Sequence, residues 1–526
     1  MQQLSPPILN KLYNKIKEIV GSGWVSKEIA DRITSSKERW PRYHLNLREG
    51  FIGTYPLLVV WPKNKKELAL ILKLCSEFQL SLEKDSTTSE TMQVYHNIAI
   101  LLNRMDKIRE IDPQKGIVEV ESGVLTLHLE EALTRHQMTL GHFPQTILNS
   151  SVGSWLSSHS VGYASSLYGH FFDMILDIEI LFADGQTHWI SKNSQLLSSF
   201  GENINLSGII TAVRLRIQNI SITRHFRGVL FPSLEDGLNA MRQIRQKSVP
   251  PPSIMRLYDK FDTLFSKHRN ASMPTTNNQL NRKLSDQILP PSKTPIINKL
   301  KKSFKDSLKK TRHQALQKIV QHTEKSEEWL EKILTPNALF ILVYEGHNEQ
   351  ETETQMTQAL QICKEYQGKD LGSKPALNWY QHRYDPRFQQ AKLLAEGAIT
   401  DTLVLKAPWS KIFSLLQKVK HKLKDKAFLL THFSNATLEG CNAYVSFIAY
   451  TEKHKKLRLY DDIREDVLKI TSKMDVNFKY DDQADPQEIT EKEEEAKKTE
   501  LAFVHAVESA LLEQIMNTKK NQGSSS

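Results

Sequence analysis

Between residues 55 and 218, short apolar segments with strand character alternate with amphipathic helical segments, and this order constrains the fold most. The segment YPLLVVWP reads as a buried strand, and NKKELALILKLCSEF follows it with Asn64 and Glu67 at the spacing of a helix capping box. Two strand-like segments flank the turn DPQKG, where valines alternate with glutamates. A hairpin through ADG and the alternating segment GIITAVRLRIQ end the region. The pattern predicts an α+β domain.

Changes in pattern along the chain predict four parts. Residues 1–50 form an N-terminal helical segment, and residues 51–220 form the α+β domain. A second domain covers 221–455 and contains a basic helical insert near 294–332, and residues 456–526 form a charged helical tail.

Composition is that of a soluble globular protein. The chain has 526 residues, of which 39% are hydrophobic and 25% are charged. Its only cysteines, Cys75, Cys363 and Cys441, give no disulfide framework and no metal-binding spacing, which favours a reducing, cytoplasmic location and no metal. No apolar run reaches membrane-spanning length, and lysines interrupt the N-terminal segment where a signal peptide would be apolar. The net charge of +10 is too dispersed to predict nucleic-acid binding.

One segment, residues 150–169, is unusually rich in small side chains: 12 of its 20 residues are glycine, serine or alanine. Small residues beside a sheet let a ligand approach the backbone, so that peptide N–H groups can donate to it. The alternative is a tight loop packed against a helix of the same domain. Both interpretations stay open at this stage.

Several segments in order resemble a known family. PLLVVWPKNKKELALILKLC, RMDKIREIDPQKGIVEVESGV, GHFPQTILNSSVGSWLSSHSVGYASSLYG and GIITAVRLRI look like the flavin-binding domain of the vanillyl-alcohol oxidase / p-cresol methylhydroxylase superfamily. LFPSLEDGLNAMRQI, PPPSIMRLYDKF, ITDTLVLKAPWSKI and THFSNATLEGCNAYVSFIAY are similar to the cap domain of alkylglycerone-phosphate synthases. The resemblance implies an α+β fold: a two-subdomain FAD-binding domain of the p-cresol methylhydroxylase type, followed by an α+β cap domain.

The resemblance also implies a chemistry. Members of the synthase family hold FAD non-covalently, remove a proton from an acylated dihydroxyacetone phosphate, and exchange its fatty acid for a fatty alcohol without net redox change. A lipid-like phosphate substrate, a cation that binds its phosphate, and acid–base groups near the flavin follow from this.

Cofactor residues are carried over only where this sequence matches the family. The positions implied to hold FAD are Thr88, Ser89, Gln145, Thr146, Ser150, Ser151, Gly153, Ser158, His159, Ser160, Gly162, Gly208, Ile209, Ile210 and Thr211. Two loops differ, because LEKDSTTS (82–89) stands where the family has PIGGGTS, and GENINLSG is shorter than the family's glycine-rich loop. Asp85 would place a carboxylate beside a pyrophosphate, which opposes binding.

Three residues match catalytic positions of the family. Tyr444 falls where an acid–base tyrosine is expected, and Arg387 and Arg256 fall where arginines would bind the substrate phosphate. A core tyrosine and solvated surface arginines are the alternatives. The family's run of three histidines after the tyrosine is missing, and His432, elsewhere in the chain, reads more readily as a structural residue.

Three hypotheses therefore stay open. The first is an FAD-linked synthase or oxidase of this family, and the second is a flavin-free pseudoenzyme that retains the fold for binding. The third is peripheral membrane or partner binding through 294–320, where six lysines and one aspartate lie between 299 and 310. The glutamate-rich tail also resembles export signals of secreted bacterial effectors, and a homodimer is compatible with the sequence.

Overall fold

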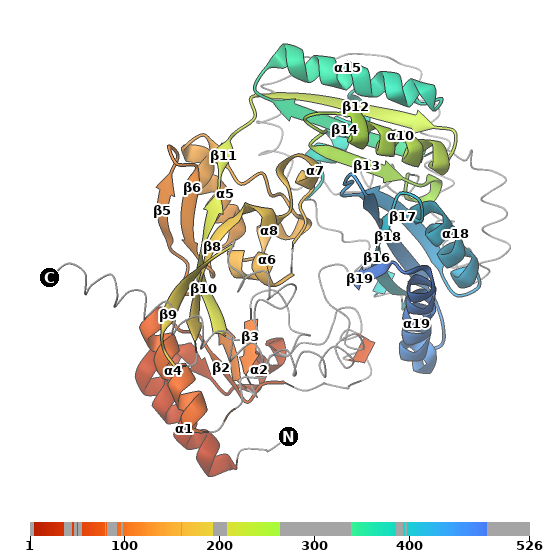
Figure 1. Ribbon diagram of the computed structural model, residues 1–526. Helices are drawn as coiled ribbons and strands as arrows, with labels where there is room; N and C mark the ends of the chain where they lie inside the picture. Colours follow the sequence, from red (N-terminus) through yellow and green to blue (C-terminus); the bar gives the residue numbers. More distant parts are fainter. Residues whose placement is uncertain are drawn as a thin grey trace, which may run out of the picture. The chain divides into compact units, whose positions relative to one another are not determined.

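The computed structural model describes two compact units of the chain, Met1–Ile220 with Lys479–Ser526, and Ser221–Phe478 (Figure 1). The described residues are 5–35, 45–46, 50, 55–78, 80, 92–95, 98–158, 160–182, 184–192, 208–263, 338–384, 393–394 and 397–480. Within these ranges, no helix combines the length and the apolar character that crossing a membrane requires. The basic insert near 294–332 and the tail beyond residue 480 lie outside the described residues.

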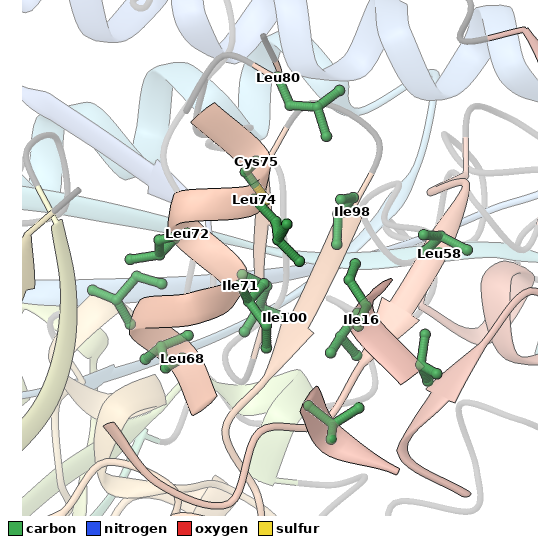
Figure 2. Close-up of a cluster of buried hydrophobic side chains, with 14 of the residues drawn as sticks. Ile16, Leu58, Leu68, Ile71, Leu72, Leu74, Cys75, Leu80, Ile98 and Ile100 are labelled. Carbon is green, nitrogen blue, oxygen red and sulfur yellow. The ribbon is translucent and has the colours of Figure 1, made fainter. Parts of the chain in front are cut away.

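The first unit begins with a small sheet covered by two helices. Its strands run in the order β1 (Val25–Ser26), β2 (Leu58–Val60), β4 (Ile98–Leu101) and β3 (Met92–Tyr95), and the helices are α1 (Pro6–Val20) and α4 (Lys65–Glu77). The predicted capping residue begins α4, because the Asn64 side chain accepts a hydrogen bond from the Glu67 N–H at 2.9 Å. Figure 2 shows the apolar side chains that join α1 and α4 to the sheet. The segment 1–50 is therefore in part an element of this unit's core.

A second layer of this unit is an antiparallel sheet of five strands. Its order is β5 (Ile108–Asp112), β6 (Ile117–Glu121), β10 (Gly208–Arg216), β8 (Ile175–Phe182) and β9 (Thr187–Ser191). The predicted hairpin is confirmed, since β8 and β9 pair directly, and Gly185 between them has a φ of 83° that favours glycine. Four short helical elements hold the small-residue segment and its flanks: η2 (Gln145–Leu148), α6 (Val152–Ser158), α7 (Ser165–Tyr168) and α8 (Phe171–Met174). Helix α5 (Thr126–Arg135) precedes them.

The second unit is built on an eight-stranded sheet. Its order is β15 (Lys369–Asp370), β12 (Thr223–Phe231), β14 (Ala338–Gly346), β13 (Ile254–Tyr258), β17 (Phe428–Ser434), β18 (Gly440–Ala449), β16 (Ile399–Pro408) and β19 (Asn477–Tyr480). Its helices are α10 (Leu234–Lys247), α15 (Glu349–Glu365), α16 (Lys374–Gln381), α18 (Ile412–Leu423) and α19 (Lys456–Met474).

Two glycines show which helix covers which face of this sheet. A methyl group on Gly237 of α10 would lie 2.7 Å from the Leu257 side chain, so α10 packs on the face that carries Leu257. A methyl group on Gly228 of β12 would lie 2.6 Å from Pro375 of α16, so α16 packs on the opposite face. Successive strand residues point to opposite faces, so Arg256 and Tyr258 share the face of α16.

The second unit extends past the predicted boundary at residue 455. Helix α19 packs against α18 and β16, and the Tyr460 hydroxyl at its buried face donates to Asp401 at 2.8 Å. Residues 456–478 are therefore part of the second unit, and the prediction that a charged tail begins at 456 is wrong for them. The charge pattern suggested a solvated helix, but the side of α19 that carries Tyr460, Ile463 and Val467 is buried.

Candidate functional site

A row of aromatic side chains crosses three neighbouring strands of the second unit. Tyr258 of β13 lies directly opposite His432 of β17, and His432 lies directly opposite Tyr444 of β18. The rings of His432 and Tyr444 are stacked, with centroids 4.9 Å apart and planes 3° from parallel. The ring centroids of Tyr258 and His432 are 5.5 Å apart, and the two ring planes are tilted by 35°. These three residues, called the ring row below, bring the predicted Tyr444 beside a titratable histidine.

The hydroxyl of Tyr444 is held by an amide donor. Asn435 Nδ2 donates to the Tyr444 hydroxyl oxygen at 2.7 Å. Asn435 directly follows β17 and has a φ of 53°, a left-handed conformation that asparagine tolerates better than most residues. The Ser434 hydroxyl donates to Asn435 Oδ1 at 3.3 Å, which points the NH₂ group toward Tyr444. A donor on the phenol oxygen favours the phenolate, so this arrangement suits a tyrosine that gives up its proton.

The imidazole of His432 contacts a buried carboxylate. His432 Nδ1 lies 3.2 Å from Asp262 Oδ2, and both side chains are buried. Asp262 is in turn positioned by its own N–H, which donates to Asp259 Oδ1 at 2.8 Å. The second oxygen of Asp259 pairs with Lys420 of α18 at 3.0 Å. The histidine is thus fixed in orientation by a carboxylate on its Nδ1 side.

Arg256 is buried on the same face as the ring row. Its Nε donates to the Tyr258 hydroxyl at 3.0 Å. Its guanidinium lies 5.3 Å from the ring centre of Trp379, which is on α16. Only 5% of Arg256 is exposed, so the alternative of a solvated surface arginine is wrong for this residue. A buried guanidinium beside an aromatic ring suits the binding of an anionic ligand such as a phosphate.

The spacing between strands gives the distance from Arg256 to Tyr444 across this face. Arg256 lies on β13 and Tyr444 on β18, with β17 between them. Neighbouring strands lie about 4.8 Å apart, so the two backbones are separated by about 10 Å. A ligand that contacts both side chains therefore has to extend across β17.

The segments implied to hold FAD converge in the first unit. Ser122, which follows β6, joins two of them: the Gly153 N–H donates to Ser122 O at 2.8 Å, and the Ser122 N–H donates to Thr211 O at 3.0 Å. The Ser122 hydroxyl donates to Ile210 O at 2.7 Å. Segments 145–153 and 208–211 thus meet at one place, as a shared ligand would require.

Within this region, small side chains serve the packing of the unit itself. A methyl group on Gly153 would lie 3.0 Å from Ser122 Cβ, and one on Gly162 would lie 2.7 Å from the Phe143 nitrogen. The N–H groups of Ser150 and Ser160 donate to backbone carbonyls of the same unit at 2.9 and 3.1 Å. The packing interpretation of the small-residue segment therefore holds for these positions.

Other predicted cofactor residues have definite places. Gln145 and Thr146 begin η2. Gly208 opens β10, where a methyl group would lie 2.7 Å from Leu181 O, and the Ile209 and Ile210 side chains that follow are buried in the core. The buried residues of the small-residue segment include Ser150, Ser151 and Ser160.

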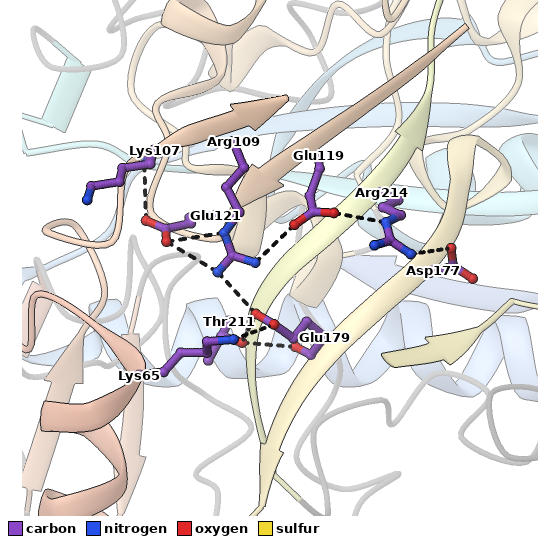
Figure 3. A network of polar contacts seen from close by, with 9 residues as sticks. All are labelled: Lys65, Lys107, Arg109, Glu119, Glu121, Asp177, Glu179, Thr211 and Arg214. Carbon is purple, nitrogen blue, oxygen red and sulfur yellow. Dashed lines mark hydrogen bonds and ion pairs between the residues drawn. The ribbon is translucent and has the colours of Figure 1, made fainter. Parts of the chain in front are cut away.

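A charged network lies across the five-stranded sheet (Figure 3). Glu179 of β8 accepts hydrogen bonds from Lys65 at 2.6 Å, from Arg109 at 3.1 Å and from Thr211 Oγ1 at 2.8 Å. Burial raises the pKa of Glu179, but these hydrogen bonds outweigh it and hold the pKa below its usual value. The predicted cofactor residue Thr211 therefore uses its hydroxyl inside this network, and only its backbone remains as a candidate cofactor contact.

Two ring nitrogens in the same unit lack a hydrogen-bond partner among the described residues. They are His142 Nδ1 and Trp155 Nε1, both fully buried, with ring centres 4.6 Å apart. Burial lowers the pKa of His142 to about 3, so the ring is neutral. His142 Nε2 lies 3.3 Å from the hydroxyl of the predicted cofactor residue Ser160. Unsatisfied buried nitrogens next to converging segments fit a polar ligand such as FAD.

Four predicted site residues lie outside the described residues: Thr88, Ser89, His159 and Arg387. Ser158 ends α6, but its side chain is also outside the description. Among the side chains that the structure describes, no group of three histidine, cysteine or acidic residues is placed to hold a metal ion. The roles of these five residues stay predictions.

Sequence reasoning missed Asp262 and Asn435 and treated His432 as structural. Asp262 is 170 residues away from His432 in the chain, so no spacing rule joins them. A usable signal was the alternation along THFSN, which places His432 on the same face as Ser434, next to the turn at Asn435.

Comparison with known proteins confirms the predicted fold and the family resemblance. The family model described as "FAD binding domain" matches residues 56–191, and the model described as "FAD linked oxidases, C-terminal domain" matches residues 223–474. The alkyldihydroxyacetonephosphate synthase of Trypanosoma brucei brucei is 21% identical over 491 residues, which are 89% of this chain and 74% of that protein. The synthase of Caenorhabditis elegans is 22% identical over 403 residues, 73% of this chain and 60% of that protein.

Solved structures show the same fold. An alkyldihydroxyacetonephosphate synthase structure has a TM-score of 0.69 at 19% identity and covers 90% of this chain and 80% of its own. A structure of p-cresol methylhydroxylase with bound substrate has a TM-score of 0.62 at 15% identity and covers 90% of this chain and 89% of its own.

Proposed function

We propose that this chain, which belongs to the FAD-linked oxidases through both of its domains, binds FAD and acts on a lipid-like phosphate ester as a synthase-like transferase. The observation that carries the proposal is the polarised Tyr444 hydroxyl on the same sheet face as the buried Arg256. Similarity to alkyldihydroxyacetonephosphate synthases over most of the chain supports the substrate class.

The first unit would hold the cofactor at segments 145–153 and 208–211, which meet at Ser122, and at the neighbouring buried nitrogens His142 Nδ1 and Trp155 Nε1. When bound, FAD supplies a redox-active ring that can exchange electrons with a substrate.

The second unit would bind and orient the substrate. The Arg256 guanidinium binds the phosphate, and the Trp379 ring beside it limits access of water. Tyr444 gives and takes a proton at its hydroxyl oxygen, while the Asn435 amide stabilises the negative charge that appears there. The distance of about 10 Å between the two strands matches the length of a three-carbon phosphate with its ester group.

The test begins with purification of the full chain from cells supplied with FAD, followed by measurement of visible absorbance before and after heat release of flavin. A stoichiometric flavin signal is expected. Exchange of the substrate proton with D₂O, followed by mass spectrometry of acyl dihydroxyacetone phosphate, then tests Tyr444. Tyr444→Phe should slow exchange at least about 100-fold, the effect of losing a general acid–base group.

Tyr460→Phe is the matched control for this variant. It also removes a tyrosine hydroxyl from a hydrogen bond, here to the half-buried Asp401, but on α19 away from the ring row. It should exchange at the wild-type rate. Equal rates in Tyr444→Phe and in Tyr460→Phe would contradict the proposed role of Tyr444.

A flavin-free binding protein is the second candidate function. The observation that favours it is the internal use of hydrogen-bonding groups at Ser150, Ser160 and Thr211, together with Asp85 in the altered loop. A colourless protein that also fails to bind added FAD in calorimetry would support this candidate. Membrane contact through 294–320, secretion and dimerisation stay proposals, and vesicle flotation with anionic lipid would test the first of them.

A further inference from the structure

His432 is on the strand between those of Arg256 and Tyr444, the two residues proposed to contact the substrate. Arg256 and Tyr258 lie on β13, Tyr444 lies on β18, and the strand between them carries His432 in the same row. The ring is stacked on Tyr444 at 4.9 Å and tilted against Tyr258 at 5.5 Å. A ligand that joins Arg256 to Tyr444 therefore passes the imidazole.

Asp262 decides which nitrogen of this imidazole carries a proton. A carboxylate only accepts hydrogen bonds, so at 3.2 Å it selects the form of His432 that donates from Nδ1. In the neutral ring, that form has its lone pair on Nε2.

Several titratable side chains lie around the His432 imidazole. The groups that contact it include Tyr258 of β13, Asp262 from the segment after β13, and Tyr444 of β18. Lys420 of α18 pairs with Asp259, whose other oxygen accepts from the Asp262 N–H. The carboxylate of Asp262 acts on the imidazole through Nδ1.

We propose that His432, oriented by Asp262, is a further acid–base residue of this site. It accepts a substrate proton at Nε2, keeps its Nδ1–H on Asp262, and later returns the proton from Nε2. Tyr444 serves the neighbouring oxygen of the same substrate. The inference rests on the proposed function for its substrate but not for its geometry.

The first test needs no activity. Full-length protein with ¹⁵N-labelled histidine is titrated by NMR, and His432→Gln identifies the signal. We expect a proton on Nδ1 and a titration midpoint that is about one pH unit lower in Asp262→Asn than in the wild type, since a carboxylate partner is removed. Addition of dihydroxyacetone phosphate should shift the signal. A proton on Nε2, or a midpoint that Asp262→Asn leaves unchanged, would overturn the inference.

The second test measures proton exchange of acyl dihydroxyacetone phosphate in D₂O. His432→Gln should lower the rate at least about 100-fold with little change in KM, and Asp262→Asn about tenfold, with its pH profile moved to lower pH. His225→Gln is the control, because this histidine of β12 contacts Glu349 at 3.1 Å, away from the ring row.

The two proposals fail in different ways. A wild-type rate in His432→Gln, in a protein that binds FAD and exchanges the proton, overturns the histidine role alone. No flavin and no exchange in the wild type overturns the proposed function. The NMR titration then decides the histidine by itself: Asp262 dependence together with a phosphate-induced shift supports a working pair, and the lack of either rejects it.

Discussion

The five-stranded sheet of the first unit and the eight-stranded sheet of the second both carry polar side chains across neighbouring strands, but with different arrangements. In the first, Arg109 pairs with Glu119 and Glu121 at 3.2 Å and with Glu179 at 3.1 Å, so opposite charges satisfy one another. In the second, a histidine ring lies between two tyrosine rings, and the Asp262 carboxylate contacts the histidine. The first arrangement holds the fold together, whereas the second is suited to moving protons.

If this contrast is right, substitutions in the first unit should mainly change stability, and substitutions in the ring row should mainly change chemistry.

The largest stability effect is expected for Arg109→Met. The change leaves Glu121 and Glu179 without their guanidinium partner, and removal of one member of a part-buried ion network costs about 3–4 kcal/mol. Urea unfolding at pH 7 measures the loss. Lys115→Met is the control, because its pair with Asp112 is exposed and should contribute nothing measurable.

Lowering the pH should reduce the difference in the free energy of unfolding between the wild type and Arg109→Met. The pKa of Glu179 is held below its usual value near 4.5, so its stabilisation is present above that pH and is lost as the pH falls through the lower folded-state value. A difference that stays constant down to pH 2 would show that Arg109 acts through packing alone.

Glu130 should give a pH dependence of opposite sign. Burial raises the pKa of this carboxyl from 4.5 to about 7, although Thr139 and the Leu140 N–H donate to it. The folded state therefore holds the proton more tightly, and stability falls as the pH rises from about 4.5 to about 7, by about 3 kcal/mol in total. Glu130→Gln should remove this slope in urea unfolding between pH 5 and pH 8. An unchanged slope would assign it to other groups.

Gly162→Ala separates packing from cofactor binding in the small-residue segment. The added methyl group would meet the Phe143 nitrogen at 2.7 Å, which should lower the free energy of unfolding by about 2 kcal/mol with or without FAD. Gly23→Ala is the control, since nothing lies within 4 Å of its added carbon. Unchanged stability of the flavin-free protein, combined with loss of flavin, would instead make Gly162 a cofactor position.

Much of the fold was predictable because it depends on local pattern. The capping residues of α4, the strand at 58–60 and the hairpin of β8 and β9 follow from neighbouring residues, and the structure confirms them. The end of the second unit was not predictable in this way. The charges of α19 suggested a tail, and only its packing on α18 shows that one side is buried.

The candidate site was predictable only where one residue carries the signal. Tyr444 and Arg256 were found by resemblance, and the structure places them on one sheet face. The pairing of His432 with Asp262 depends on β13 lying beside β17, which no local pattern encodes. The left-handed turn at Asn435 depends likewise on how β17 ends.

Asn435 offers the finest test of the division between the two sheets, because its backbone and its side chain can be changed separately. Asn435→Ala removes the amide from Tyr444 and places alanine at a φ of 53°, so it should cost about 1–2 kcal/mol in unfolding. Asn435→Gly removes the same amide but accepts that φ, so it should cost about 1 kcal/mol or less. Both variants should slow proton exchange to the same extent, about tenfold, since both lose the donor that stabilises the phenolate. If exchange instead followed stability, with glycine close to wild type and alanine impaired, Asn435 would serve the turn and not the tyrosine, and the ring row would be a structural feature like the network of the first unit.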